Sequence, residues 1–415
     1  MNDIESVYET GTSFSGRLTL NTRQIAISNT FQIISSSIAS LFISAFIWKS
    51  SYSLVYVCVY NLGSYLMHPC AFYLNRQILS RIGLKKSYVI GALIASLTII
   101  NVAFWPFYNA PILFFCGCCY GIGSGLYWSN RNVLEYIETK NSNRQYFYSL
   151  IYAIGWIADI IVPFVCGWFV SAFSTDVSKA HIAYFILFGI SFLLMVTCAY
   201  WIYRTKFKTI WLSKNLVSFK FKLNNRRLIS ISIGICEGIG FLGPLLTLYY
   251  FKSEIAMGSL VSLSALATAL SMYVYGIYNV NQNNYKGLLI SSALFTITAL
   301  LLAIRHTVAP VILFVIFSDI FVSFFGLIAQ PILFHLIENE DLINDFKHTY
   351  SYIIDNELYL NVGRIMSIMF LLIITVIFSD KSALLYCPLF IGIAQFAIAF
   401  RVKAIQGSIF INPIT

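Results

Sequence analysis

Charged residues are scarce in this sequence. Lys, Arg, Asp and Glu make up 11% of its 415 residues, whereas hydrophobic residues make up 58%. An ordinary soluble domain carries about 25% charged residues. A soluble protein this apolar would need several large cores separated by polar linkers, and the chain has no such linkers. The composition therefore excludes a typical water-soluble fold and favours lipid as the surrounding solvent.

Signatures of catalysis and cofactor binding are also missing. The nine cysteines lie in apolar runs, and the densest group, Cys116 to Cys119, lacks the spacing and the histidines of a zinc site. The glycines between positions 121 and 125 follow no predicted strand, which argues against a dinucleotide site. No serine elbow, His-Glu metal cluster or ATP-binding loop is present. We therefore expect no enzyme, no cofactor and no metal site.

Twelve long apolar runs are present instead. A membrane span needs about 20 apolar residues, so the sequence predicts an all-α membrane protein with twelve transmembrane helices. The predicted spans are Ile25–Trp48, Leu54–Tyr73, Ser87–Phe107, Pro111–Ser129, Phe147–Phe173, His181–Tyr203, Leu228–Tyr250, Ser259–Tyr278, Gly287–Ala303, Val308–Phe334, Leu358–Phe378 and Ala383–Phe400.

Basic residues are distributed unevenly between alternate loops. Of the 27 Lys and Arg residues, most fall on one side of the predicted spans. The loops of the opposite side hold only Lys49, Lys179, Lys252, Arg305 and Lys381. Because basic residues in short loops stay in the cytoplasm, both termini are predicted to be cytoplasmic. The net charge of +10 therefore reflects membrane topology and does not indicate a nucleic-acid partner.

One basic segment, residues 204–227, contains no acid and divides the chain into residues 1–203 and 228–415, with six spans each. We interpret it as a cytoplasmic linker that helps to set the topology. A docking surface for an acidic partner or for anionic lipid head groups is the alternative.

The segment after the second span contains Arg81, Gly83 and Lys85 and has Ser80 in place of an acid. With the six-plus-six arrangement, it resembles the major facilitator superfamily, whose permeases carry G-x-x-x-D-R-x-G-R-K there. The resemblance implies two pseudo-symmetric six-helix bundles and transport by alternating access. It also implies a gating role for Arg81, Gly83 and Lys85.

Two further stretches resemble a bacterial subgroup of the same superfamily. Tyr127-Trp128 with Arg131 ends the predicted fourth span, and Glu357 to Arg364 matches E-x-x-L-N-x-G-R at the eleventh. The resemblance implies a bacterial cytoplasmic membrane and adds Arg131, Glu357 and Arg364 to the gating residues. Glu357 and Arg364 share a helical face, so they are predicted to form a charge lock, unless Arg364 extends to the lipid head groups.

Three acids lie deep inside predicted spans: Asp159, Glu237 and Asp319. An ionisable group in a bilayer costs about 2.5 to 3.5 kcal/mol on insertion scales, so each needs a function or a partner. In the resembling family the first, fourth, seventh and tenth spans line the cavity. Glu237 and Asp319 thus become the first candidates for proton coupling and Asp159 the third, with structural acids as the alternative.

Uncharged polar residues within the spans supply further candidates. Gln32, Asn61 and Gln330 are predicted to line the cavity wall. His68 precedes Pro69 and is interpreted as a core histidine in a kinked turn.

The resulting hypothesis is a proton-coupled secondary transporter whose partners are a small organic solute, protons and the lipid bilayer. Small residues persist around Pro163 in the fifth span, notably Ala158, Cys166 and Gly167, where family exporters carry glycines. Export is therefore the preferred direction. Proton-coupled uptake and a non-transporting escort or sensor protein remain the alternatives.

Overall fold

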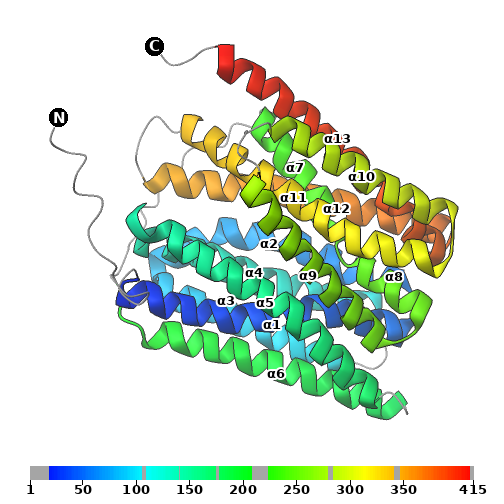
Figure 1. Ribbon diagram of the computed structural model, residues 1–415. Coiled ribbons are helices and arrows are strands. Elements are labelled where there is room, and N and C mark those ends of the chain that lie inside the picture. The colour runs from blue at the N-terminus through cyan, green and yellow to red at the C-terminus, as the bar shows by residue number, and fades with distance from the viewer. Residues whose placement is uncertain are drawn as a thin grey trace.

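The structure is a computed structural model that describes residues 18–104, 109–139, 141–173, 177–207, 223–278, 284–340 and 346–411. In these residues it contains thirteen α-helices and no strand (Figure 1). The helices are α1 (Leu20–Ser51), α2 (Leu54–Ile82), α3 (Leu84–Phe104), α4 (Ala110–Glu138), α5 (Asn141–Phe173), α6 (Val177–Arg204), α7 (Asn225–Gly238), α8 (Leu242–Phe251), α9 (Glu254–Tyr278), α10 (Asn284–Ile304), α11 (Val308–Glu340), α12 (Phe346–Ile377) and α13 (Asp380–Ile411).

The described helices form a bundle of twelve spans, because α7 and α8 together cross it once. Ten helical stretches are long and apolar enough to span a membrane, and the stretch from Asn225 to Phe251 is one of them. Backbone hydrogen bonds within each helix satisfy the polar groups that lipid cannot. The predicted all-α, twelve-span fold class is confirmed.

The predicted seventh span, Leu228–Tyr250, is wrong in one respect, since its helix is interrupted. Helix α7 ends at Gly238 and α8 begins at Leu242. The reason lies in the local sequence: Pro244 has no N–H to donate to the carbonyl group of Gly240, and its ring clashes with that carbonyl. The interruption exposes an irregular turn that lines a cavity between the helices, as described below.

The predicted end of the fourth span is also corrected. The sequence predicts an end at Ser129, but α4 continues to Glu138. The charged and polar residues beyond Ser129 are typical of a loop. They remain helical because they are buried against other helices, which satisfy them.

The first connection in each half of the chain has the same unusual backbone. Tyr52, the residue that follows α1, has φ 51° and ψ 30°. Lys252, the residue that follows α8, has φ 51° and ψ 27°. Both residues are left-handed although neither is glycine, and each is followed by a serine and then a new helix. Equivalent positions in α1–α6 (the N-terminal half) and α7–α13 (the C-terminal half) thus share one local geometry.

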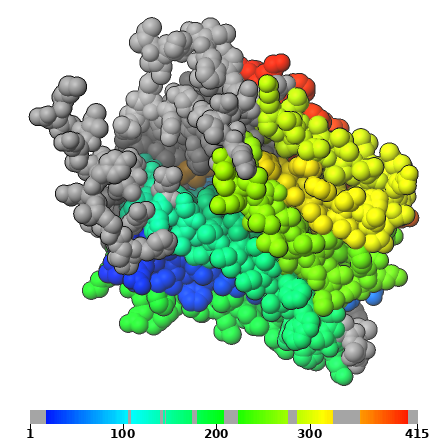
Figure 2. Space-filling model, in the orientation of Figure 1, coloured from blue at the N-terminus to red at the C-terminus, as the bar shows by residue number. Residues whose placement is uncertain are grey.

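The largest contacts between the halves are those of α5 with α9 and of α2 with α12, and α1 also contacts α8. Figure 2 shows α5 and α9 side by side on one face of the molecule. Small residues allow their backbones to approach closely. A Cβ atom added at Gly258 would collide with the carbonyl oxygen of Pro163, and one at Gly167 with that of Glu254.

The α5–α9 contact yields a testable prediction. We expect Gly258→Ala to destabilise the protein by about 1 to 3 kcal/mol, because the added methyl group forces the backbones apart. Thermal unfolding of the purified protein in detergent measures this. Gly189→Ala is the matched control, since a Cβ atom there meets nothing within 4 Å. Equal melting temperatures for the two variants would contradict the predicted close contact.

Candidate functional site

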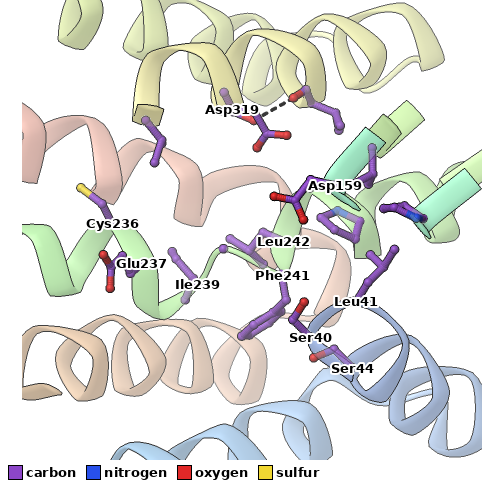
Figure 3. A pocket seen from close by; sticks show the side chains of 18 of the residues that line it. Ser40, Leu41, Ser44, Asp159, Cys236, Glu237, Ile239, Phe241, Leu242 and Asp319 are labelled. Carbon is purple, nitrogen blue, oxygen red and sulfur yellow. Dashed lines mark hydrogen bonds between the residues drawn. The ribbon is translucent and has the colours of Figure 1, made fainter. Parts of the chain in front are cut away.

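A cavity of about 660 Å³ lies between the two halves. Helices α1, α2, α4 and α5 line it from the N-terminal half, and α7 to α11 with α13 line it from the C-terminal half. The turn between α7 and α8 forms part of its wall through Ile239, Gly240 and Phe241 (Figure 3). The break in the seventh span therefore shapes the cavity directly.

Asp159 and Asp319 reach this cavity from opposite halves. Figure 3 shows Asp159 on α5 and Asp319 on α11, both pointing into it, and both side chains are exposed to it. The hydroxyl group of Ser37 donates to Asp159 Oδ1 at 3.0 Å, and that of Ser264 donates to Asp319 Oδ2 at 2.6 Å. Within the described residues neither carboxylate has a basic partner. The two lie close enough to interact electrostatically.

Glu237 also lines the cavity but has a different environment. Nη2 of Arg364 donates to Glu237 Oε2 at 2.7 Å, while Nη1 lies 3.2 Å from Glu357 Oε1. The guanidinium group also lies over the ring of Tyr65, 5.6 Å from its centroid. Arg364 is thus held between two carboxylates and an aromatic ring, and it does not extend to the head groups.

His68 joins this cluster from the other half. Its Nε2 lies 3.3 Å from Glu357 Oε1, and its Nδ1 is hydrogen-bonded to Ser124 Oγ at 2.9 Å. The histidine is buried, as the sequence indicated, but it does more than fill a turn at Pro69. It connects α2 of one half to α12 of the other.

Arg131 lies inside α4 and is 6% exposed, away from the loop in which the sequence placed it. Its Nε donates to Glu135 Oε1 at 2.7 Å and its Nη1 to Gln32 Oε1 at 3.0 Å. Asn29 donates to the same carboxylate oxygen at 2.7 Å. Gln32, predicted to line the cavity wall, is not among the residues that line this cavity, and its side chain accepts from Arg131 instead.

The loop after α2 keeps only part of its predicted gating arrangement. Gly83 ends α2 with φ 79°, a conformation that favours glycine. Lys85 donates to the carbonyl oxygen of Thr205 at 2.8 Å. Arg81 is exposed, and in the part of the chain that the structure describes it forms no ion pair.

Of the other uncharged candidates, Asn61 lines the cavity and donates to the carbonyl oxygen of Val57 at 2.9 Å. The side chain of Gln330 lies outside the described residues.

Contacts at the far end of α1 close one side of the space between the halves. Lys49 forms an ion pair with Glu254 at the start of α9, and the hydroxyl group of Tyr184 donates to Glu254 at 3.2 Å. The backbone N–H of Leu54 donates to Asp380 at 2.9 Å. The sequence analysis did not identify Glu254. An acid shortly before a predicted span, on the side of the membrane that holds few lysines, could have indicated an ion pair with Lys49.

An apolar helical bundle with a cavity between its two halves that carries three acidic side chains is typical of a multi-pass membrane protein of the transporter class. The family model of the Major Facilitator Superfamily matches residues 24–340, and the chain belongs to that superfamily. It is therefore a secondary transporter by family.

The chain is also similar to known proteins in sequence and in fold. The chain is 24% identical over 383 residues to the uncharacterized protein YqgE of Bacillus subtilis, covering 89% of this chain and 86% of that protein. Its fold is similar to that of the nucleoside transporter NupG (TM-score 0.61, 15% identity, 93% and 99% of the two chains covered). It is also similar to that of the POT family transporter PepTSo (TM-score 0.68, 11% identity, 93% and 98% covered).

The Arg131 cluster yields a second prediction. Arg131→Met leaves the Glu135 carboxylate buried without its cation, so we expect a loss of about 3 to 5 kcal/mol of stability. Thermal unfolding in detergent again measures it. The exposed Arg81→Met is the control and should change stability by less than about 0.5 kcal/mol. If Arg131→Met and Arg81→Met melt at the same temperature, the buried ion pair is not the stabilising element inferred here.

Proposed function

We propose that this protein moves a small organic solute through the cavity by proton-coupled alternating access, and that Asp319 and Asp159 carry the coupling proton. The observation that carries the proposal is the environment of these two acids. Both are exposed to the cavity, each is bonded to a serine hydroxyl group, and no described basic residue pairs with either. Removal from water disfavours the charged form of a carboxylate that has no basic partner, so each of these acids is suited to bind and release a proton.

Glu237, the first candidate from the sequence, becomes the second here. The Arg364 guanidinium group at 2.7 Å supplies a fixed positive charge, so protonation would break an ion pair. Among the described residues, the charged groups that line this cavity are Asp159 on α5, Asp319 on α11 and Glu237 on α7, and Arg364 on α12 contacts only Glu237 of these three. Only Asp159 and Asp319 change charge without losing a partner.

Alternating access requires the halves, residues 1–203 and 228–415, to part at each end in turn, with 204–227 as their linker. The Lys49–Glu254 ion pair closes the predicted outer end and the His68–Glu357 contact joins the halves nearer the cytoplasm. We propose a bacterial cytoplasmic membrane with both termini in the cytoplasm. Export is the proposed direction, supported by the close packing of Gly167 and Gly258 across α5 and α9.

The proposal predicts the outcome of a transport assay in which the solute need not be identified beforehand. Protein reconstituted in liposomes is given a mixture of cationic, neutral and anionic small molecules, and a pH gradient is imposed. Mass spectrometry of the vesicle contents should find solutes that accumulate only with both protein and gradient. We expect Asp319→Asn to reduce that accumulation to the level of protein-free vesicles, because the proton carrier is lost.

The control variant is Glu138→Gln, which removes an acid at the end of α4, outside the cavity lining, and keeps an oxygen that accepts from Asn21. It should accumulate the same solutes as the wild type. Accumulation that persists in Asp319→Asn and Asp159→Asn but is lost in Glu237→Gln would assign the proton to Glu237 instead. Solute movement down its own gradient, with no response to pH in the wild type, would remove proton coupling altogether.

The sign of the pH gradient distinguishes the two directions of transport. An exporter accumulates solute in vesicles by exchange for protons leaving them, whereas an uptake permease accumulates solute together with entering protons. If no solute of any charge moves in either gradient, the protein is an escort or sensor and not a transporter.

A further inference from the structure

The charge of the cavity is opposite to that of the whole protein. The sequence has 27 basic and 17 acidic residues, a formal net charge of +10. Among the described residues that line the cavity, however, Asp159, Glu237 and Asp319 are acidic and none is Lys, Arg or His. Arg364 compensates Glu237. The charges of Asp159 and Asp319 are left for an occupant of the cavity to neutralise.

A second group in the cavity wall lacks a partner. Tyr60 on α2 is 4% exposed, and its hydroxyl oxygen has no hydrogen-bond partner among the described residues. A buried polar group without a partner costs about 1 to 3 kcal/mol. Because Tyr60 lines the cavity, a bound molecule that reaches the hydroxyl group would recover this energy. Tyr60 is therefore independent evidence for a ligand with a polar hydrogen-bonding group.

Aromatic rings line the cavity together with the acidic pair. Trp156 lies three residues before Asp159 on α5, hence on the same helical face, and both line the cavity. Phe241 also lines the cavity, and its ring lies beside Ser40 in Figure 3. Aromatic faces attract cations, by about 0.5 to 2 kcal/mol depending on desolvation. The structure already shows one such contact at this cavity, between Arg364 and Tyr65 at 5.6 Å.

We propose that the cavity binds an organic cation, an apolar or aromatic molecule that carries a protonated or quaternary nitrogen or a similar onium centre. Its positive charge lies between Asp159 and Asp319, and its apolar body packs against Trp156 and Phe241. An N–H group of a protonated amine bonds the free hydroxyl group of Tyr60. This inference deepens the proposed function by naming the class of solute, and it rests on that function for the transport step.

A metal ion fits the same cavity poorly. In the described residues no three His, Cys, Asp or Glu side chains gather at one point. Hard divalent cations take six or more oxygen ligands, whereas this lining offers two serine-bonded carboxylates between aromatic and aliphatic side chains. A neutral or anionic solute would leave both carboxylates uncompensated. An organic cation is the class that satisfies the charge, the aromatic faces and the Tyr60 hydroxyl group together.

Cation and proton then compete for the same two carboxylates. When Asp159 or Asp319 binds a proton, its attraction for the cation is lost, and the cation is released. Ser37 and Ser264 remain as hydrogen-bond donors in both states, and the Glu237–Arg364 pair on the neighbouring wall keeps its net charge. The exchange of one solute charge for one proton is the form of coupling that this arrangement supports.

Binding of two oppositely charged ions of the same shape tests the inference. Tetraphenylphosphonium and tetraphenylborate are added to the purified full-length protein in detergent, and binding is measured by calorimetry. The Asp159→Asn/Asp319→Asn double variant supplies the background from the micelle. We expect the phosphonium cation to bind the wild type and the borate anion not to bind above that background.

The single variants locate the site. Asp159→Asn and Asp319→Asn should each weaken tetraphenylphosphonium binding at least about tenfold, because each removes one of the two charges facing the ligand. Glu138→Gln should bind it as the wild type does, because Glu138 lies outside the cavity lining. A melting temperature close to that of the wild type shows that each variant is folded. Lowering the pH should weaken phosphonium binding to the wild type, since protons occupy the same carboxylates.

Tyr60 is tested with a ligand that can use its hydroxyl group. Tyr60→Phe should weaken binding of 3,3-diphenylpropylammonium, which has N–H donors, by about three- to tenfold. The same variant should leave tetraphenylphosphonium, which has none, unchanged. An equal effect on both ligands would mean that Tyr60 acts through packing, and its role as a hydrogen-bonding group would be wrong.

The inference is overturned if tetraphenylborate binds as tightly as tetraphenylphosphonium, or if both single Asp variants retain phosphonium binding. These outcomes are separate from a failure of the proposed function. Neutral or anionic solutes that accumulate in vesicles through Asp319, without phosphonium binding, would leave transport intact and reject the cation. Phosphonium binding without any pH-driven transport would keep the binding site and reject the transport function.

Discussion

The high energy of a charge inside a bilayer governs this structure more than any other constraint. Apolar packing against lipid discriminates little between one arrangement of helices and another, since lipid tails are as apolar as leucine. A buried charge does discriminate, because it must find a partner or an aqueous space. Arg131 finds Glu135 and Gln32, and Arg364 finds Glu237 and Glu357. The helices that carry these residues are thereby fixed relative to one another.

Two kinds of intramembrane charge result from this constraint. Charged residues that form ion pairs, such as Arg131 and Glu135, are buried. Hydrogen bonds from this pair to α1 position α1 and α4 within one half. Asp159 and Asp319 have serine partners only and face the cavity. The first kind holds the scaffold together, while the second gives the cavity its chemistry. The Arg364 cluster lies between these cases, because it lines the cavity through Glu237 and also reaches across to the other half through Glu357.

The close approach of backbones works with these charges. Glycines at 167 and 258 bring α5 and α9 together at the end where Lys49 meets Glu254. The interrupted helix at residues 239–241 places irregular backbone in the wall of the cavity. The tight α5–α9 contact and the irregular turn between α7 and α8 are both suited to a bundle whose two halves move about a central site. Irregular backbone at membrane depth is tolerated there because it lines a cavity.

The sequence by itself determined the fold class and the number of spans, because these follow from the length of apolar runs, which local composition records. It indicated the superfamily through a resemblance carried by short motifs, such as the one that runs from Glu357 to Arg364. It also identified Asp159, Glu237 and Asp319, since an acid within an apolar run is visible without a structure. It misplaced Arg131 and missed the break before Pro244, because burial against other helices decides whether a polar stretch stays helical. Only the tertiary structure showed which acids are paired: residues 237 and 364 are distant in sequence, and side chains from different helices meet only once the bundle has formed.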